Sequence, residues 1–146
     1  SSIVLASLGT ARAKARDAIR LSNLRTMQNA LELYYDSNGS YPSTGGAWFG
    51  TCASFGSKAT SGAGGYVPNL APTYIPSLPS GSNALPSSDA NSACGYLYNS
   101  NGTDYIFLAW FAVETYTYAS NPRKRNIYIT ESPPTFAIYS PGAYGW

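Results

Sequence analysis

The pattern of hydrophobic positions predicts one long helix at the start of the chain. Residues 1–36 contain no proline and a single glycine, Gly9. In the second half of this segment apolar residues recur at steps of three and four, which predicts a helix with one buried face. These residues are Leu21, Leu24, Met27, Leu31 and Tyr34. We expect the helix to stop near Gly39 and Pro42, because glycine takes a left-handed cap readily and proline blocks continuation.

The first half of this helix has a different pattern. It begins with an apolar stretch, and its remaining apolar positions are mostly alanine, which forms helix well but buries little. Basic residues at i, i+4 and i+8 predict a cationic stripe. It faces one of four surroundings: solvent, the phosphates of nucleic acid, the headgroups of a membrane, or acidic groups of neighbouring subunits. We therefore expect this half to project from the domain. The apolar residues of interest are Ile3, Val4, Leu5 and Leu8, and the basic ones are Arg12, Arg16 and Arg20.

Residues 37–93 have the composition of a long loop, rich in serine, glycine, proline, alanine and asparagine. Scattered aromatic and aliphatic residues predict that this loop is ordered and packed, since long structureless loops are uncommon in compact domains. A short helical turn is expected at 69–74, and the five prolines between Pro68 and Pro86 exclude a longer helix.

The strongest strand signal lies in the last third of the chain. Two runs, 95–98 and 105–113, flank a segment that contains Asn101-Gly102, a typical hairpin turn. The second run is apolar at both alternating sets of positions, so we expect a central strand with one face on the helix and the other under the middle loop. Further strands are expected at 127–129 and 136–139, joined by a turn at 132–134.

These elements predict an α+β fold: one long N-terminal helix packed on a small antiparallel sheet, with a long ordered loop between them. We interpret residues 1–146 as a single domain, made of the helix (1–36), the loop region (37–93) and the sheet with the C-terminal region (94–146).

Composition argues against an enzyme. Charged residues make up 11% of the chain, the net charge is +2, and there is no histidine. Histidine-dependent nucleophilic catalysis therefore cannot be built, and neither a phosphate-binding loop nor a metal-ligand spacing is present. We expect no catalytic residue, no cofactor and no metal site. The only two cysteines, Cys52 and Cys94, are expected to form a disulfide, which implies an oxidising compartment.

The residues of the helix and of the hairpin together resemble the family of type IV pilins and type II secretion pseudopilins. The resemblance is carried by the apolar start 1–8, the stalk-like segments 11–18 and 24–35, and the helix exit Asp36-Ser37-Asn38-Gly39-Ser40-Tyr41-Pro42. It extends more loosely over 94–98 and 102–105, while residues 43–93 and 114–146 carry no assigned motif. The family implies a ladle-like fold, in which a long helix lies against an antiparallel sheet.

The resemblance also implies partners and a location. A further apolar segment would precede Ser1 in the precursor and complete a membrane span, which takes about 20 apolar residues. The subunit would sit in the bacterial inner membrane before it joins identical or homologous subunits in a filament at the periplasm or cell surface, with the help of an assembly machinery. The apolar start and the basic stripe would then be assembly residues. The C-terminal run 136–146 has no acidic residue, which argues against the calcium site of the major pseudopilins.

Three functions follow from this resemblance. The first is a structural subunit of a type IV pilus-like filament. The second is a pseudopilin of a secretion system. The third is a minor pilin that binds DNA or a surface, for which the adjacent cations Arg123, Lys124 and Arg125 are the candidate phosphate contacts.

Overall fold

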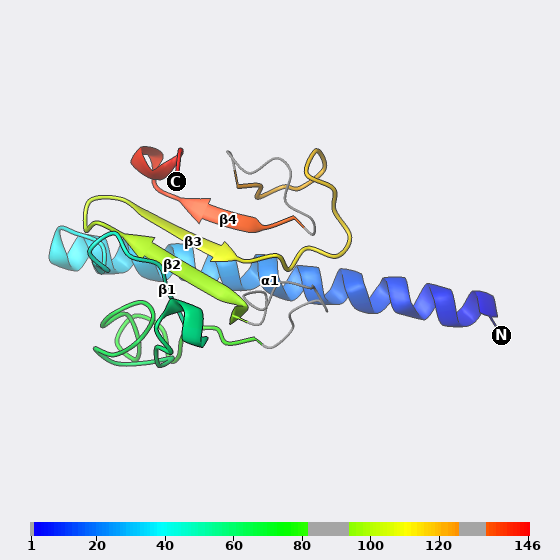
Figure 1. The fold of residues 1–146 in the computed structure, drawn as a ribbon, viewed down its shortest axis with the longest axis horizontal. Coiled ribbons are helices and arrows are strands. Elements are labelled where there is room, and N and C mark those ends of the chain that lie inside the picture. Colours follow the sequence, from blue (N-terminus) through cyan, green and yellow to red (C-terminus); the bar gives the residue numbers. More distant parts are fainter. Residues whose placement is uncertain (1, 82–93, 126–133) are drawn as a thin grey trace.

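A computed structural model describes residues 2–81, 94–125 and 134–146, and side chains from Ser7 onward. The chain forms one long helix and a four-stranded antiparallel sheet in the order β1-β2-β3-β4 (Figure 1). The helix is α1 (Ser2–Asn38), and the strands are β1 (Phe49–Gly50), β2 (Tyr96–Ser100), β3 (Tyr105–Ala109) and β4 (Phe136–Tyr139). Two short 3₁₀ helices, η1 (Ala53–Phe55) and η3 (Pro141–Ala143), complete the described elements. The expected α+β class is thereby confirmed.

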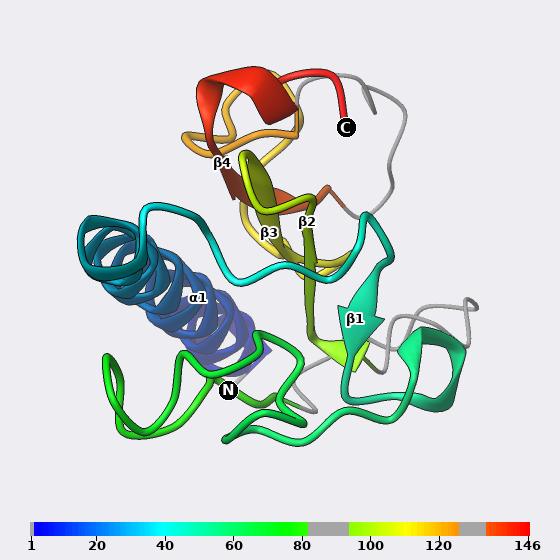
Figure 2. The same ribbon diagram turned by 90° about the vertical axis from the view of Figure 1, so that its left-hand side faces the viewer.

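The helix packs on the sheet through the predicted apolar stripe. Leu24, Met27 and Leu31 are fully buried in the core between helix and sheet. The helix ends as expected, because Gly39 adopts a positive φ of 70° and its N–H donates to the carbonyl of Tyr35 at 2.7 Å. Figure 2, which looks nearly along α1, shows the helix on one side of the sheet and the C-terminal segment on another.

The predicted hairpin is present. Tyr98 of β2 pairs with Phe107 of β3, and the side-chain oxygen of Asn101 accepts from the backbone N–H groups of Thr103 and Asp104 in the turn. The predicted second strand was too long, however, because β3 ends at Ala109 instead of Val113. Phe111 takes a positive φ of 45°, which breaks the extended backbone. The chain then bends toward α1.

Both faces of β3 are buried, as predicted. Phe107 lies in the core on the helix side, whereas Ile106 and Leu108 lie in a second core on the opposite face. The cover of that second core differs from the prediction. Among the described residues, the start of the middle loop contributes Trp48, Cys52 and Phe55 to this cover. The other covering residues are Trp110, Tyr139, Ala143 and Trp146.

Residues 66–78 of the middle loop pack on the helix side of the sheet. Their buried apolar residues belong to the same core as the helix stripe: Tyr66, Val67, Leu70, Ala71, Ile75 and Leu78. The expected helical turn is limited to a series of turns in which the N–H of Tyr74 donates to the carbonyl of Leu70 at 2.9 Å. Within the described residues, the apolar side chains of the loop are packed, as its composition predicted, but mainly on the face of the sheet that carries the helix.

The disulfide between Cys52 and Cys94 is present, with a Cα–Cα distance of 4.9 Å. It joins the residue before η1 to the segment that leads into β2. The predicted strand at 136–139 is confirmed as β4, whereas the predicted strand at 127–129 and most of the turn at 132–134 lie outside the described residues.

Candidate functional site

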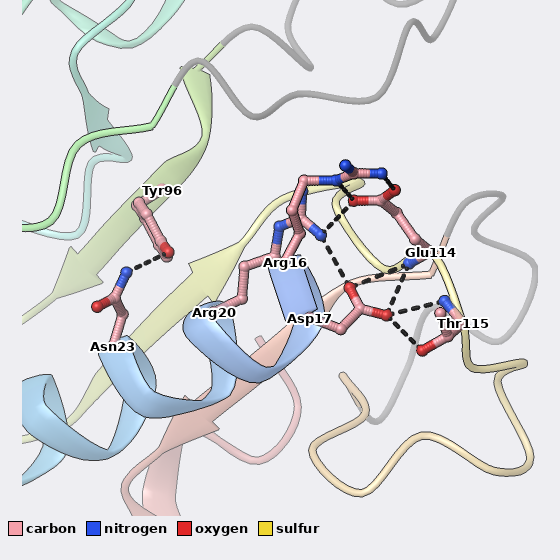
Figure 3. A network of polar contacts seen from close by, with 7 residues as sticks. All are labelled: Arg16, Asp17, Arg20, Asn23, Tyr96, Glu114 and Thr115. Atoms are coloured by element: carbon pink, nitrogen blue, oxygen red, sulfur yellow. Dashed lines mark hydrogen bonds and ion pairs between the residues drawn. The ribbon is translucent and has the colours of Figure 1, made fainter. Parts of the chain in front are cut away.

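The most extensive polar network in the described part of the chain fastens α1 to the segment after β3. Asp17, which is only 1% exposed, accepts hydrogen bonds from the backbone N–H of Thr115 at 2.8 Å and from its hydroxyl at 2.7 Å. It also accepts from the backbone N–H of Glu114, and it pairs with Arg20 at 2.8 Å. Because these donors come from the bent segment beyond β3, one helix carboxylate holds that segment in place (Figure 3).

Glu114 completes this network, which we call the helix clamp: Arg16, Asp17, Arg20, Glu114 and Thr115. The two carboxylate oxygens of Glu114 accept hydrogen bonds from Nε and Nη2 of Arg16. One of these oxygens also accepts from Arg20 at 2.7 Å. The hydrogen bonds from Arg16 lower the pKa of Glu114 below its ordinary value, and the same contact raises the pKa of Arg16.

The clamp divides the predicted cationic stripe. Arg12 is exposed, Arg16 is half-buried, and Arg20 is only 4% exposed. Two of the three arginines are therefore paired with carboxylates of the same chain. Arg12 is exposed, and Arg16 keeps 42% of its side-chain surface in solvent. Asp17 precedes Arg20 by three residues, a spacing that favours an ion pair on a helix. No local pattern in the sequence links either residue to Glu114.

The part of α1 before the clamp carries mainly exposed side chains from Ser7 onward. Residues 7–12 are exposed, and Leu8 keeps 46% of its surface in solvent. Figure 1 shows this end of the helix running beyond the sheet. The projecting part is shorter than the predicted half, because the clamp begins at Arg16. Ile3, Val4 and Leu5 lie within α1, but their side chains are outside the described part of the structure.

None of the described helices combines the length and hydropathy that a membrane span requires. The described residues likewise contain no group of acidic or cysteine side chains arranged to hold a metal ion.

The basic cluster near the C-terminus does not form one surface. Arg125 is only 4% exposed, with its guanidinium over the rings of Trp48 and Trp110 at 5.3 and 5.5 Å from their centroids. Lys124 is exposed and lies over Tyr118, while Arg123 is half-buried. Arg123 and Lys124 line a shallow groove beside β4. The other lining residues are Gln28, Asn121, Pro122, Ala137, Ile138 and Tyr139. Of the three predicted phosphate contacts, Arg123 and Lys124 line this groove, whereas Arg125 is buried.

A cluster of tyrosines near the end of α1 was not anticipated by the sequence analysis. The rings of Tyr35, Tyr41 and Tyr105 follow one another with centroids 4.7 and 4.6 Å apart. The hydroxyl of Tyr41 donates to Glu32 at 3.2 Å. Burial, and then the charge of Glu32, raises the pKa of Tyr41 to about 12. The pKa values of Tyr98 and Tyr105 are raised further, again chiefly by burial.

These shifts predict alkaline instability. The neutral phenols are favoured in the fold, so their contribution is intact below pH 10, the ordinary tyrosine pKa, and is lost as the pH rises from there through about 12. We expect the free energy of unfolding to fall across this range, and tyrosinate absorbance to appear together with loss of structure. Tyr41→Phe should shift the onset upward, whereas Tyr144→Phe, at an exposed ring, should not. Ionisation of all 13 tyrosines near pH 10 with the fold intact would contradict the prediction.

Comparisons with known proteins give no assignment: no family model, no curated protein and no solved structure matches this chain. Function is therefore inferred from the geometry of α1, of the clamp and of the rest of the domain, which we call the head (described residues 39–81, 94–125 and 134–146).

Proposed function

We propose that this chain is a structural subunit of a filament similar to type IV pili, with α1 as its assembly element. The single observation that carries the proposal is the part of α1 before the clamp. It continues the helix past the sheet (Figure 1), its described residues 7–12 are all exposed, and Leu8 keeps 46% of its surface in solvent. Isolated helix is only marginally stable in water and gains most of its stability from packing. A projecting helix end of this kind is therefore suited to packing against neighbouring subunits.

The dimensions of the helix support the same proposal. At about 1.5 Å per residue, the 37 residues of α1 extend over roughly 55 Å. The clamp fixes the direction in which this rod leaves the head, which is what a repeating assembly needs from each subunit. Contacts between neighbouring apolar helix ends would contribute about 25 cal/mol per Å² of apolar surface removed from water.

The disulfide of the head is consistent with a position outside the cytoplasm. The Cys52–Cys94 disulfide suits an oxidising compartment such as the periplasm or the cell surface. A ladle-like pilin fold is our proposed interpretation of the helix and sheet. A pseudopilin would use the same helix in the same manner, since one fold serves both machines.

The test is electron microscopy of cells that express the natural gene. Antibodies raised against this chain should label thin surface filaments. Leu8→Asp should abolish most of the labelled filaments at an unchanged level of the protein, because a charge is placed at the proposed contact. Tyr144→Asp is the matched control, since Tyr144 is also exposed (59%) but lies in the head. Labelled material that is only soluble, or equal loss in both variants, would refute the proposal.

A further inference from the structure

Charged side chains on one lateral face of α1 are separated by sign along its length. Lys14, Arg25, Glu32 and Asp36 are all exposed. Their spacings of 11, 7 and 4 residues place them within about 40° of one another around the helix axis. The two cations come first and the two acids last, so this face, which we call the charge strip, is basic toward the N-terminus and acidic toward the C-terminus.

The charge strip is not neutralised within the described part of the chain. There, no side-chain hydrogen bond or ion pair joins Lys14, Arg25 or Asp36 to another residue, and Glu32 accepts only from the neutral phenols of Tyr41 and Tyr105. Arg16 and Arg20 differ in this respect, because the clamp satisfies both. The strip thus holds the charges of α1 that remain available to a partner, together with Arg12.

Asp36 also opposes the intrinsic electrostatics of the helix. It lies in the last turn of α1, where the C-terminal end carries partial negative charge and no basic residue is present. A carboxylate there destabilises the isolated subunit. A cation supplied from outside the chain would offset both the carboxylate and the helix end.

We propose that a second copy of this chain supplies this cation: Lys14 of one subunit contacts Glu32 and Asp36 of the next, with the two helices parallel and staggered. The inference rests on the proposed filament. Lys14 precedes the two acids by 18 and 22 residues, so at 1.5 Å per residue the stagger is about 30 Å. Because the basic half of one copy meets the acidic half of the next, the contact is heterologous and leaves both ends of a pair open for further subunits.

Zero-length cross-linking tests this contact directly. A carbodiimide joins a lysine amine to a carboxylate as an amide, with loss of water, only where the two are in contact. The chain has three lysines, Lys14, Lys58 and Lys124, so the products are few. Within one copy, Lys14 and Glu32 are about 27 Å apart along the helix. A Lys14–Glu32 or Lys14–Asp36 product is therefore necessarily intermolecular.

We expect sheared filaments to give these two products and a ladder of species larger than a dimer. Lys14→Arg keeps the charge but removes the amine, so filaments should persist while the products disappear. Lys14→Glu should abolish filaments, and Lys14→Glu combined with Glu32→Lys and Asp36→Lys should restore them. Filaments in which Lys14 is unlinked or linked elsewhere, or products confined to a dimer, would overturn this inference alone. Absence of labelled filaments from the parent cells would overturn the proposed function and this inference with it.

Discussion

Asp17→Ala is expected to destabilise the domain by about 3–5 kcal/mol, the range for breaking a buried ion pair by removing one partner. The substitution removes one of the two carboxylates that contact the buried Arg20, which keeps its contact with Glu114, and it removes the acceptor for the backbone N–H groups of Glu114 and Thr115. The loss includes a structural part, because the segment after β3 would no longer be held against α1. Chemical denaturation monitored by circular dichroism measures this change.

Two control variants distinguish the contribution of the clamp to stability from general effects of substitution in the helix. Arg12→Ala, on the exposed turn before the clamp, should change the free energy of unfolding by less than about 0.5 kcal/mol. Asp17→Asn keeps the size of the side chain and part of its capacity to accept hydrogen bonds. Its loss in free energy of unfolding should therefore lie between those of Asp17→Ala and Arg12→Ala. An Asp17→Ala variant as stable as Arg12→Ala would show that the clamp does not contribute to stability.

Removal of the disulfide is expected to be comparably costly. The bond closes a segment with a sequence separation of 42, and a loop of this length corresponds to about 4 kcal/mol in the chain-entropy model. Replacement of both Cys52 and Cys94 by serine should therefore lower the free energy of unfolding by about that amount, or by somewhat less where the unfolded chain retains structure. The natural chain under reducing conditions provides a matched comparison without any substitution.

The position of the disulfide determines which part of the domain responds. Cys52 and Cys94 lie with Leu97, Ile106 and Leu108 in the core on the face of the sheet opposite the helix. Hydrogen exchange in the serine variant should therefore increase first in β1 and at the start of β2, with the helix core less affected. Uniform loss of protection, including Leu24 and Leu31, would contradict this order.

The helix and the hairpin were predictable from sequence because their signals are local. The stripe through Leu24, Met27 and Leu31 has helical period, and Asn101-Gly102 supplies its own turn geometry. The single cysteine pair left one pairing, and it is the observed one.

The features that sequence did not predict depend on contacts between residues far apart in the chain. The clamp joins Asp17 to Thr115 across 98 positions, and no local pattern marks that pairing. The early end of β3 depends on the backbone of Phe111, in a run whose composition favours a strand throughout. The separation of Arg125 from Arg123 and Lys124 likewise requires two tryptophans, Trp48 and Trp110, that approach from different segments. For these reasons the α+β class follows from local patterns in the sequence, whereas the burial of Arg20 and Arg125 does not.

The clamp also determines how mechanical load enters the molecule. A pull on the projecting end of α1 reaches the domain first at Arg16, Asp17 and Arg20, before it reaches the apolar core that begins at Leu24. Through Glu114 and Thr115 part of that pull passes into the segment that leaves β3, one of the two inner strands of the sheet. Tension along the helix is thereby shared between two elements far apart in sequence, and β3 bears it together with its neighbours β2 and β4.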